Sequence, residues 1–134
     1  MIDSTKHQGM RRHLVEQLRK KGITDEEVLS AIGSVPRHLF MDSGFESHAY
    51  QDKAFPIAAE QTISQPYTVA FQSQLLQVQQ GESVLEIGTG SGCQTAVLTM
   101  LGANVYSIER QHQLYRYSMR QLPKLGYRPK KLVF

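Results

Sequence analysis

The sequence lacks several features that would each point to a particular class of protein. Cys93 is the only cysteine, which excludes a disulfide within the chain. No apolar run approaches the length that spans a membrane, and no signal-peptide pattern opens the chain. Internal repeats and low-complexity segments are also absent. We therefore expect a soluble, cytoplasmic protein with no membrane partner, built as one domain of ordinary size.

A strong excess of charge is absent too, since the formal net charge is +3 over 134 residues. The basic residues are scattered apart from three adjacent pairs, and no aromatic residues interleave with them as a stacking platform for bases requires. We therefore expect no nucleic-acid partner. No pair of histidines has zinc-site spacing, so no metal is expected. The loop histidines His38 and His48 are interpreted as exposed, and Arg37 as a surface or ion-pair residue.

The first half of the chain is predicted to contain helices and a long irregular segment. A short apolar stripe among charged residues indicates a helix over residues 5–20. Thr24 and Glu27 form a capping-box pattern, which predicts a second helix over residues 25–32 with Thr24 as its N-cap. Residues 33–63 are expected to be mostly irregular, because proline and glycine punctuate them.

A third helix is predicted to begin near residue 65. Ser64 is its expected N-cap residue, and Pro66 fits the first turn. Leu75 and Leu76 contribute to an apolar side, and Gly81 is expected to close the helix.

The second half of the chain alternates strand and helix signals. Strands are predicted over residues 83–87, 104–108 and from 131 onward, with helices over 92–101 and 111–125 between them. This β-α-β-α-β order requires a parallel sheet with right-handed crossovers, so the expected fold class is α/β. Ligands of such sheets lie beyond the carboxyl ends of the strands.

Three glycines after the strand over residues 83–87 are the most informative feature. Gly88, Gly90 and Gly92 alternate with small hydroxyl residues, and Glu86 precedes them. Glycine lets backbone amides approach a ligand that any Cβ would block. The start of the following helix adds unpaired N–H groups and a partial positive charge. The pattern predicts a cradle for a nucleoside-containing cofactor.

The spacing of these glycines separates two classes of cofactor. The dinucleotide fingerprint is G-x-G-x-x-G, but Cys93 stands where its third glycine would be. That makes an NAD-dependent dehydrogenase the weakest alternative, and Cys93 itself is expected to pack behind the loop. Glu109 ends the strand over 104–108, where an acid hydrogen-bonds ribose hydroxyls. Together with Glu86, the loop resembles motif I of class I S-adenosylmethionine-dependent methyltransferases.

A second stretch makes the resemblance more specific. Residues 61–67 read Q-T-I-S-Q-P-Y, upstream of the glycine loop. With residues 35–40 and 49–50, this stretch resembles the protein-L-isoaspartate O-methyltransferases, and the resemblance runs from about Leu14 to the last residue. It implies N-terminal helices followed by the first half of a Rossmann-like methyltransferase sheet. It also implies protein repair, in which a methyl group passes from S-adenosylmethionine to the carboxylate of an L-isoaspartyl residue in a damaged protein.

The resemblance also assigns site residues. Ser64 corresponds to the active-site serine of the family. The expected cofactor-binding residues are Gln61, Thr62, Ile63, Glu86, Gly88, Gly90, Ser91, Gly92 and Glu109. A carboxylate is already a nucleophile at neutral pH, so the protein mainly has to align it with the methyl donor and exclude water. A serine that hydrogen-bonds the acceptor carboxylate suits that task, and a simple capping role for Ser64 stays open beside it.

Two departures from the family pattern matter. The segment Ala58-Ala59-Glu60 stands where family members usually carry glycines. If these positions adopt a positive φ, each residue with a Cβ costs about 1 kcal/mol or more and would shift Ser64. The chain also stops at Phe134, inside the third strand, so it looks truncated. We expect one incomplete methyltransferase domain, with a helical and loop region over residues 1–63 and a cofactor-binding α/β part over 64–134.

An incomplete sheet has consequences for function. The strand over residues 83–87 would lie at a sheet edge, and a bare apolar edge favours self-association. We expect such a chain to bind S-adenosylmethionine weakly and to turn over poorly or not at all. Two alternatives stay open, namely a methyltransferase for RNA or a small molecule, which would share motif I, and a non-catalytic interaction module.

Overall fold

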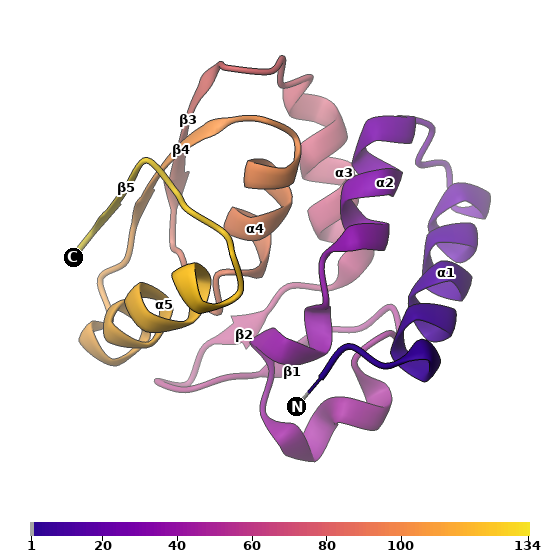
Figure 1. The fold of residues 1–134 in the computed structure, drawn as a ribbon, viewed down its shortest axis with the longest axis horizontal. Coiled ribbons are helices and arrows are strands. Elements are labelled where there is room, and N and C mark those ends of the chain that lie inside the picture. The colour runs from indigo at the N-terminus through magenta and orange to yellow at the C-terminus, as the bar shows by residue number, and fades with distance from the viewer. Residues whose placement is uncertain (1) are drawn as a thin grey trace.

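The computed structural model describes residues 2–134, and Figure 1 shows how they are arranged. The helices are α1 (Thr5–Lys20), α2 (Glu26–Ser34), α3 (Pro66–Leu76), α4 (Cys93–Met100) and α5 (His112–Lys124). Two short 3-10 helices, η1 (Arg37–Phe40) and η2 (Ser43–His48), follow α2. The strands are β1 (Phe55–Pro56), β2 (Thr62–Ile63), β3 (Ser83–Ile87), β4 (Asn104–Ile108) and β5 (Lys131–Val133). None of these helices is both long and apolar enough to cross a bilayer.

β3, β4 and β5 form a parallel sheet in that order, which confirms the predicted α/β fold. The register pairs Leu85 with Tyr106 and Ile108 with Val133. The helices α4 and α5 lie between consecutive strands along the chain, as crossovers of parallel strands must. Parallel pairing brings the carboxyl ends of β3 and β4 to the same edge, where the glycine loop and the residue after β4 meet.

The two faces of this sheet differ in what covers them. Glu86, Val105 and Ser107 point to one face and are buried. Leu85 and Ile87 alternate with Glu86 on the opposite face and are 64% and 75% exposed. Apolar residues on both faces are typical of parallel strands, which proteins usually cover on both sides. Within residues 2–134 the second face is uncovered, and β3 lies at the sheet edge as predicted.

One continuous core joins the N-terminal helices to the helices beside the sheet. In Figure 1, α2 lies between α1 and α3, and it also packs against α4. Leu18, Val28, Phe40 and Leu122 are fully buried in this core and come from α1, α2, η1 and α5. Full burial of one such side chain contributes about 1.5–3 kcal/mol. The core therefore holds the N-terminal helices and the irregular segment after them against the α/β part.

The start of α2 differs from the prediction by one residue. Asp25 is the N-cap, and its Oδ1 accepts hydrogen bonds from the amides of Glu27 and Val28 at 3.0 and 3.3 Å. The prediction of Thr24 as the cap is wrong. The amides of Thr24 and Asp25 both donate to Oε1 of Gln74 from α3, which anchors the turn in front of the helix at 2.9 Å.

The predicted cap and end of α3 are also wrong. Gln65 takes the N-cap position, not Ser64, and no side chain caps this helix. The helix ends at Leu76, earlier than expected, because Gln77 turns into the left-handed region with φ 48°. On the predicted apolar side, Val69 is buried, whereas Leu75 and Leu76 are exposed.

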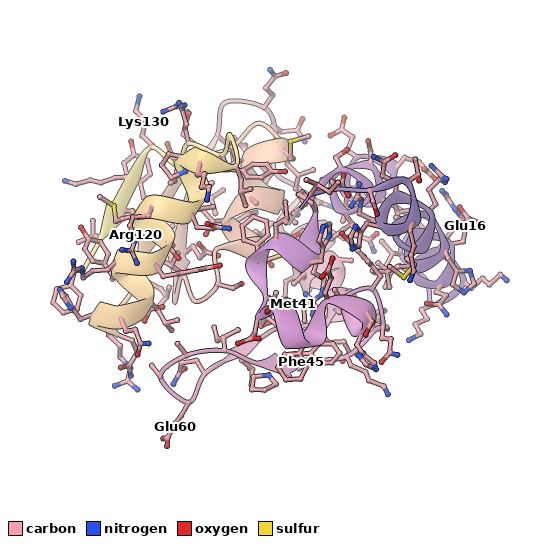
Figure 2. The ribbon with its side chains drawn as sticks, turned by 60° about the horizontal axis from the view of Figure 1, so that its bottom comes forward. Glu16, Met41, Phe45, Glu60, Arg120 and Lys130 are labelled. Atoms are coloured by element: carbon pink, nitrogen blue, oxygen red, sulfur yellow. The ribbon has the colours of Figure 1, made fainter. Side chains whose placement is uncertain are left out.

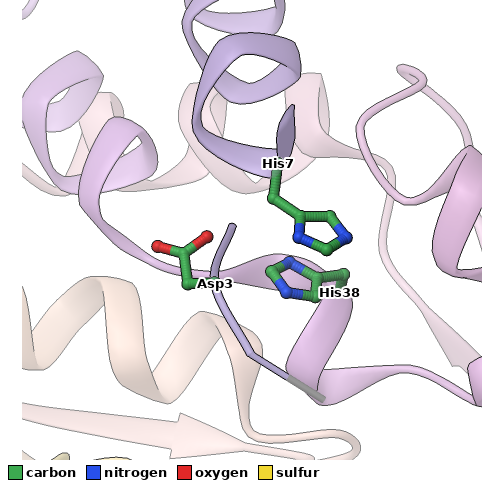
Figure 3. Close-up of side chains that lie close together, drawn as sticks. All are labelled: Asp3, His7 and His38. Atoms are coloured by element: carbon green, nitrogen blue, oxygen red, sulfur yellow. The ribbon is translucent and has the colours of Figure 1, made fainter. Parts of the chain in front are cut away.

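A buried polar cluster fastens the first residues of the chain to η1 (Figure 3). The rings of His7 and His38 are stacked, with 3.7 Å between their centroids. His38 donates from Nε2 to the carbonyl of Ile2 at 3.0 Å, and its Nδ1 accepts from the hydroxyl of Tyr50 at 2.8 Å. His38 is 0% exposed, so its interpretation as an exposed loop residue is wrong, whereas His48 is exposed as expected.

The same cluster has the composition of a metal site but not its geometry. Ligand atoms of Asp3, His7 and His38 lie within 4.8 Å of one another. Arg11 holds both oxygens of Asp3, at 3.0 and 2.9 Å, and His7 pairs through Nε2 with Glu46 at 2.9 Å. Stacked rings direct their nitrogen lone pairs in parallel, so these lone pairs do not converge on one ion. We call this hydrogen-bonded group the N-terminal clasp.

The hairpin formed by β1 and β2 has a strained tip. Ala59 and Glu60 have φ values of 58° and 56°, in the left-handed region that favours glycine. The condition under which a Cβ is costly in this segment therefore holds at Ala59 and Glu60. A residue with a Cβ costs about 1–2 kcal/mol there.

Replacing Ala59 with glycine should raise the free energy of unfolding by up to about 1 kcal/mol, because it removes the left-handed strain. The greater freedom of glycine in the unfolded chain offsets part of this gain. Urea denaturation followed by circular dichroism measures the change. Ala58→Gly is the matched control, since its φ is not in the left-handed region, and it should lower stability. Equal changes for the two variants would contradict the strain at this tip.

A second prediction concerns His38 in the N-terminal clasp. Burial lowers its pKa below the ordinary value of 6.5, and Asp3, His7, Glu46 and Tyr50 are the titratable groups around it. At a pH between the two pKa values, the imidazole of His38 is protonated in the unfolded chain and neutral in the folded chain. The free energy of unfolding should be fully retained above pH 6.5 and should fall as the pH drops below that value.

Urea denaturation at a series of pH values measures this dependence. The variant His38→Gln should flatten the decline below pH 6.5, because it removes the group that takes up the proton on unfolding. His48→Gln is the matched control, since His48 is exposed, and it should keep the decline. A decline of the same slope in both variants would show that His38 is not its source.

Candidate active site

The loop between β3 and α4, residues 88–92, lies at the carboxyl edge of the sheet as predicted. Gly88, Gly90 and Gly92 have φ values of 91°, 57° and 89°, which residues with a Cβ rarely adopt. A Cβ at Gly92 would stand 3.2 Å from Leu122, whereas a Cβ at Gly88 would meet nothing within 4 Å. The glycines therefore permit the tight turn, and Gly88 leaves the backbone open to a ligand.

Several backbone amides of this loop are paired within the chain. Gly88 and Thr89 donate to the carbonyl of Ile108 at 2.7 and 3.2 Å. Gly90 donates to the carboxylate of Glu109 at 2.8 Å. These three amides are not free donors, because the end of β4 runs beside the loop and supplies their acceptors. The first amide of α4, on Cys93, donates to the hydroxyl of Ser91 at 3.2 Å, so the expectation of an unpaired amide at the helix start is wrong for this residue. The loop presents open glycine backbone rather than a row of free donors.

Glu109 follows β4 directly, where the sequence predicts an acid that meets a ribose. Its Oε1 accepts from the amide of Gly90 and its Oε2 from the amide of Gln111, both at 2.8 Å. The residue is 4% exposed. Each carboxylate oxygen keeps a second lone pair for a ligand hydroxyl. Glu109 thus ties the loop to the end of β4, and its contact with a ribose stays a prediction.

Glu86 lies beneath the loop. Its Oε1 accepts hydrogen bonds from the hydroxyls of Thr95 and Ser107, and the hydroxyl of Ser107 also bonds to that of Thr89 at 2.6 Å. Burial raises the pKa of the Glu86 carboxyl, and the two hydroxyl bonds oppose this rise. The network joins β3, β4, α4 and the loop, so Glu86 supports the site from below. A direct contact between Glu86 and a cofactor stays a prediction.

A small cavity brings the two predicted halves of the site together. Its volume is about 60 Å³. It is lined by Thr62, Ile63, Ser64, Val69, Gly88, Thr89, Gly90, Ser91, Cys93 and Gln94. The predicted catalytic residue, Ser64, therefore shares one space with the glycine loop, although more than twenty positions separate them in the sequence. Cys93 lines this cavity but is 6% exposed and belongs to the main core, which agrees with the expectation that it packs behind the loop. Burial raises the pKa of its thiol.

Some predicted cofactor residues lie outside this cavity. They are Gln61, Glu86, Gly92 and Glu109. The side chain of Gln61 is exposed and donates to the carbonyl of Ala59 at 3.1 Å, so it belongs to the hairpin tip. Ile63 lines the cavity but is 2% exposed and packs into the main core. The structure therefore joins Thr62, Ser64 and the loop most closely.

Arg37 positions the segment that carries Ser64. It is buried and donates to the carbonyls of Ala49, Ser64 and Lys53 at 2.9, 2.9 and 3.0 Å. Burial lowers the pKa of its guanidinium, which stays protonated at neutral pH. The interpretation as a surface or ion-pair residue is wrong, because its partners are backbone carbonyls. The only sequence signal for this role is the long irregular segment, whose buried carbonyls need donors.

Comparisons with known proteins identify relatives. The sequence profile of the family described as Protein-L-isoaspartate(D-aspartate) O-methyltransferase (PCMT) matches residues 9–134. The protein-L-isoaspartate O-methyltransferase of Christiangramia forsetii is 70% identical over 134 residues, and that of Flavobacterium johnsoniae is 63% identical over 134 residues. Each alignment covers 100% of this chain and 63% of the relative, so the chain spans less than two thirds of the length of these relatives.

Solved structures agree with these matches. A protein-L-isoaspartate O-methyltransferase superposes with a TM-score of 0.80 at 27% identity, over 92% of this chain and 41% of that chain. A putative protein-L-isoaspartate O-methyltransferase from Plasmodium falciparum, in complex with S-adenosyl-L-homocysteine, superposes with a TM-score of 0.73 at 22% identity, over 92% and 62% of the two chains. The α/β methyltransferase fold is thereby confirmed, and the chain belongs to the protein-L-isoaspartate O-methyltransferase family.

Proposed function

We propose that the protein transfers a methyl group from S-adenosylmethionine to the α-carboxylate of an L-isoaspartyl residue in a damaged protein or peptide. The observation that carries the proposal is the cavity in which Ser64 lies beside Gly88, Gly90 and Ser91. A methyltransferase has to bring acceptor and donor to one point, and this cavity joins the predicted acceptor residue to the predicted donor loop. Membership of the family supports the same reaction.

The residues around the loop fit an S-adenosyl cofactor. Gly88 is open where a Cβ would stand, and Glu109 offers acceptor lone pairs beside Gly90. The cavity of 60 Å³ equals the volume of about two water molecules, so most of a nucleoside would lie along the open carboxyl edge of β3 and β4. When bound, the cofactor supplies a methyl group that its positive sulfonium activates.

The acceptor requires no general base, because a carboxylate is ionised at neutral pH. One carboxylate oxygen forms the new bond to the methyl carbon while the sulfur–carbon bond breaks, and no proton is transferred. The Ser64 residue is exposed, so its hydroxyl can donate to the second carboxylate oxygen and orient the first. Arg37 holds the carbonyl of Ser64 at 2.9 Å and thereby fixes the backbone from which this hydroxyl projects.

Repair follows from the chemistry of the ester. The neighbouring backbone amide attacks the methyl ester spontaneously, methanol leaves, and water then reopens the ring partly to a normal aspartyl linkage. The protein has to supply only the methyl transfer. The substrate class is therefore any exposed polypeptide segment that contains an L-isoaspartyl residue.

Transfer of labelled methyl groups tests the proposed reaction. Labelling of an isoaspartyl peptide from methyl-labelled S-adenosylmethionine should be slow but detectable, as expected for a sheet with one uncovered face, and the matched aspartyl peptide should stay unlabelled. Calorimetric titration with S-adenosylhomocysteine tests the cofactor site independently of turnover. Equal labelling of the two peptides would contradict the substrate assignment. Failure to bind S-adenosylhomocysteine would contradict the cofactor assignment and favour a non-catalytic module.

The variant Ser64→Ala tests the residue assignment. It should lower the rate of methyl transfer by about tenfold or more, because a hydrogen bond to a charged group contributes about 1.5–3 kcal/mol. Its affinity for S-adenosylhomocysteine should change little, since the loss concerns the acceptor. Ser83→Ala is the matched control at the exposed start of β3 and should keep the rate. An unchanged rate for Ser64→Ala would contradict the proposal that the Ser64 hydroxyl orients the acceptor carboxylate, and would leave Ser64 with a structural role only.

A further inference from the structure

A larger cavity lies beside the candidate active site. Its volume is about 540 Å³, and its walls come from the η1–η2 segment, the β1–β2 hairpin and α5. Figure 2 shows Met41 and Phe45 on one side of this region and Arg120 on the other. Leu114 and Tyr117 of α5 add to an apolar lining. A concave and mostly apolar space of this size is typical of a binding pocket.

The larger cavity adjoins the small cavity that contains Ser64. Ser91 lines both of them. Ile57 and Ala58, on the first half of the hairpin, line the larger cavity, whereas Thr62 on its second strand lines the small one. The hairpin therefore contributes to the walls of both cavities, and the two cavities adjoin each other at Ser91.

The larger cavity is placed differently from the expected cofactor edge. It reaches the glycine loop only through Ser91, and its lining includes neither Gly88 nor Gly90. Glu109, the predicted ribose partner, is not part of the lining either. A ligand in this cavity would contact Ser91 of the loop and the side of α5 that carries Leu114, Tyr117 and Arg120, which suits the acceptor side of the reaction.

A basic stripe runs along α5, and one of its members, Arg120, lines the cavity. Arg116, Arg120 and Lys124 are four positions apart, all exposed, and therefore on one side of the helix. Among residues 2–134, no salt bridge involves these three side chains. Like charges at this spacing destabilise a helix. Asp42 is the acidic residue of the cavity lining and comes from the opposite wall. Basic residues that are scattered along the sequence therefore gather on this side of α5, and the stripe favours an anionic partner.

We propose that this cavity and the basic stripe form a docking surface for the substrate polypeptide. An apolar side chain close to the isoaspartyl residue enters the cavity, and acidic side chains of the same polypeptide contact Arg116 and Arg120. The proposal rests on the proposed function, because it names what flanks the methyl acceptor. Of the partners that carry both apolar and anionic groups, a polypeptide is favoured, since the acceptor beside Ser64 is itself a carboxylate on a polypeptide.

Fluorescence anisotropy with three labelled isoaspartyl hexapeptides tests this docking surface. The first peptide carries phenylalanine next to the isoaspartyl residue and two glutamates, the second has alanine in place of phenylalanine, and the third has lysines in place of the glutamates. Titrations contain saturating S-adenosylhomocysteine at low ionic strength. The first peptide should bind about tenfold more tightly than either of the others, which corresponds to about 1.4 kcal/mol.

Two matched pairs of variants locate the effect. Gln113→Trp places a bulky group at an exposed lining position and should abolish the preference for phenylalanine, whereas Met119→Trp, exposed on the same helix but outside the lining, should keep it. Arg120→Glu should reverse the preference for glutamate, and Lys20→Glu on α1 should keep it.

Each contrary outcome overturns a stated part. Equal affinity of the wild type for the first two peptides would overturn the apolar pocket. Loss of S-adenosylhomocysteine binding in Gln113→Trp would show that the cofactor fills the cavity instead. Two results together would assign the stripe to nucleic acid. A single-stranded RNA oligonucleotide would displace the first peptide, and the first and third peptides would bind with equal affinity. The proposed function fails separately, if the first peptide and its aspartyl counterpart bind equally.

Discussion

The carboxylate of Glu109 is the interaction on which the candidate site depends. It accepts one hydrogen bond from the amide of Gly90 in the glycine loop and another from the amide of Gln111, the residue directly before α5. The carbonyl of Ile108, one position earlier, accepts the amide of Gly88. Hydrogen bonds to a carboxylate are about twice as strong as those between neutral groups, and burial excludes competing water. The loop, the end of β4 and the start of α5 therefore keep one geometry.

The acceptor side of the site depends on a different buried charge. Arg37 donates to three backbone carbonyls, one of which belongs to Ser64. The N-terminal clasp fixes η1, where Arg37 lies, through the contacts of the neighbouring His38. Two chain segments far apart in sequence are thus held separately, one by Glu109 and one by Arg37. The small cavity exists where these two supported segments meet.

The sequence predicted what depends on local pattern. The strand β3 was bounded correctly because alternating glycines follow it directly, and β4 because its apolar run ends at the acidic Glu109. It did not predict which partner a polar group selects in space. Asp25 rather than Thr24 caps α2, and Gln74 of α3 binds the amides of both residues. His38 is buried because the start of the chain folds over it. Such outcomes depend on tertiary contacts that no short window contains.

The central claim is that the glycine loop, held by Glu109, forms the cofactor surface. Titration of S-adenosylhomocysteine into the nitrogen-15-labelled chain, with amide resonances recorded at each step, tests this claim most directly. We expect the largest shifts at Gly88, Gly90 and Ser91, and Glu109→Gln should lower the affinity for S-adenosylhomocysteine about tenfold, which corresponds to about 1.4 kcal/mol. Shifts that leave these three amides unchanged and gather elsewhere would contradict it.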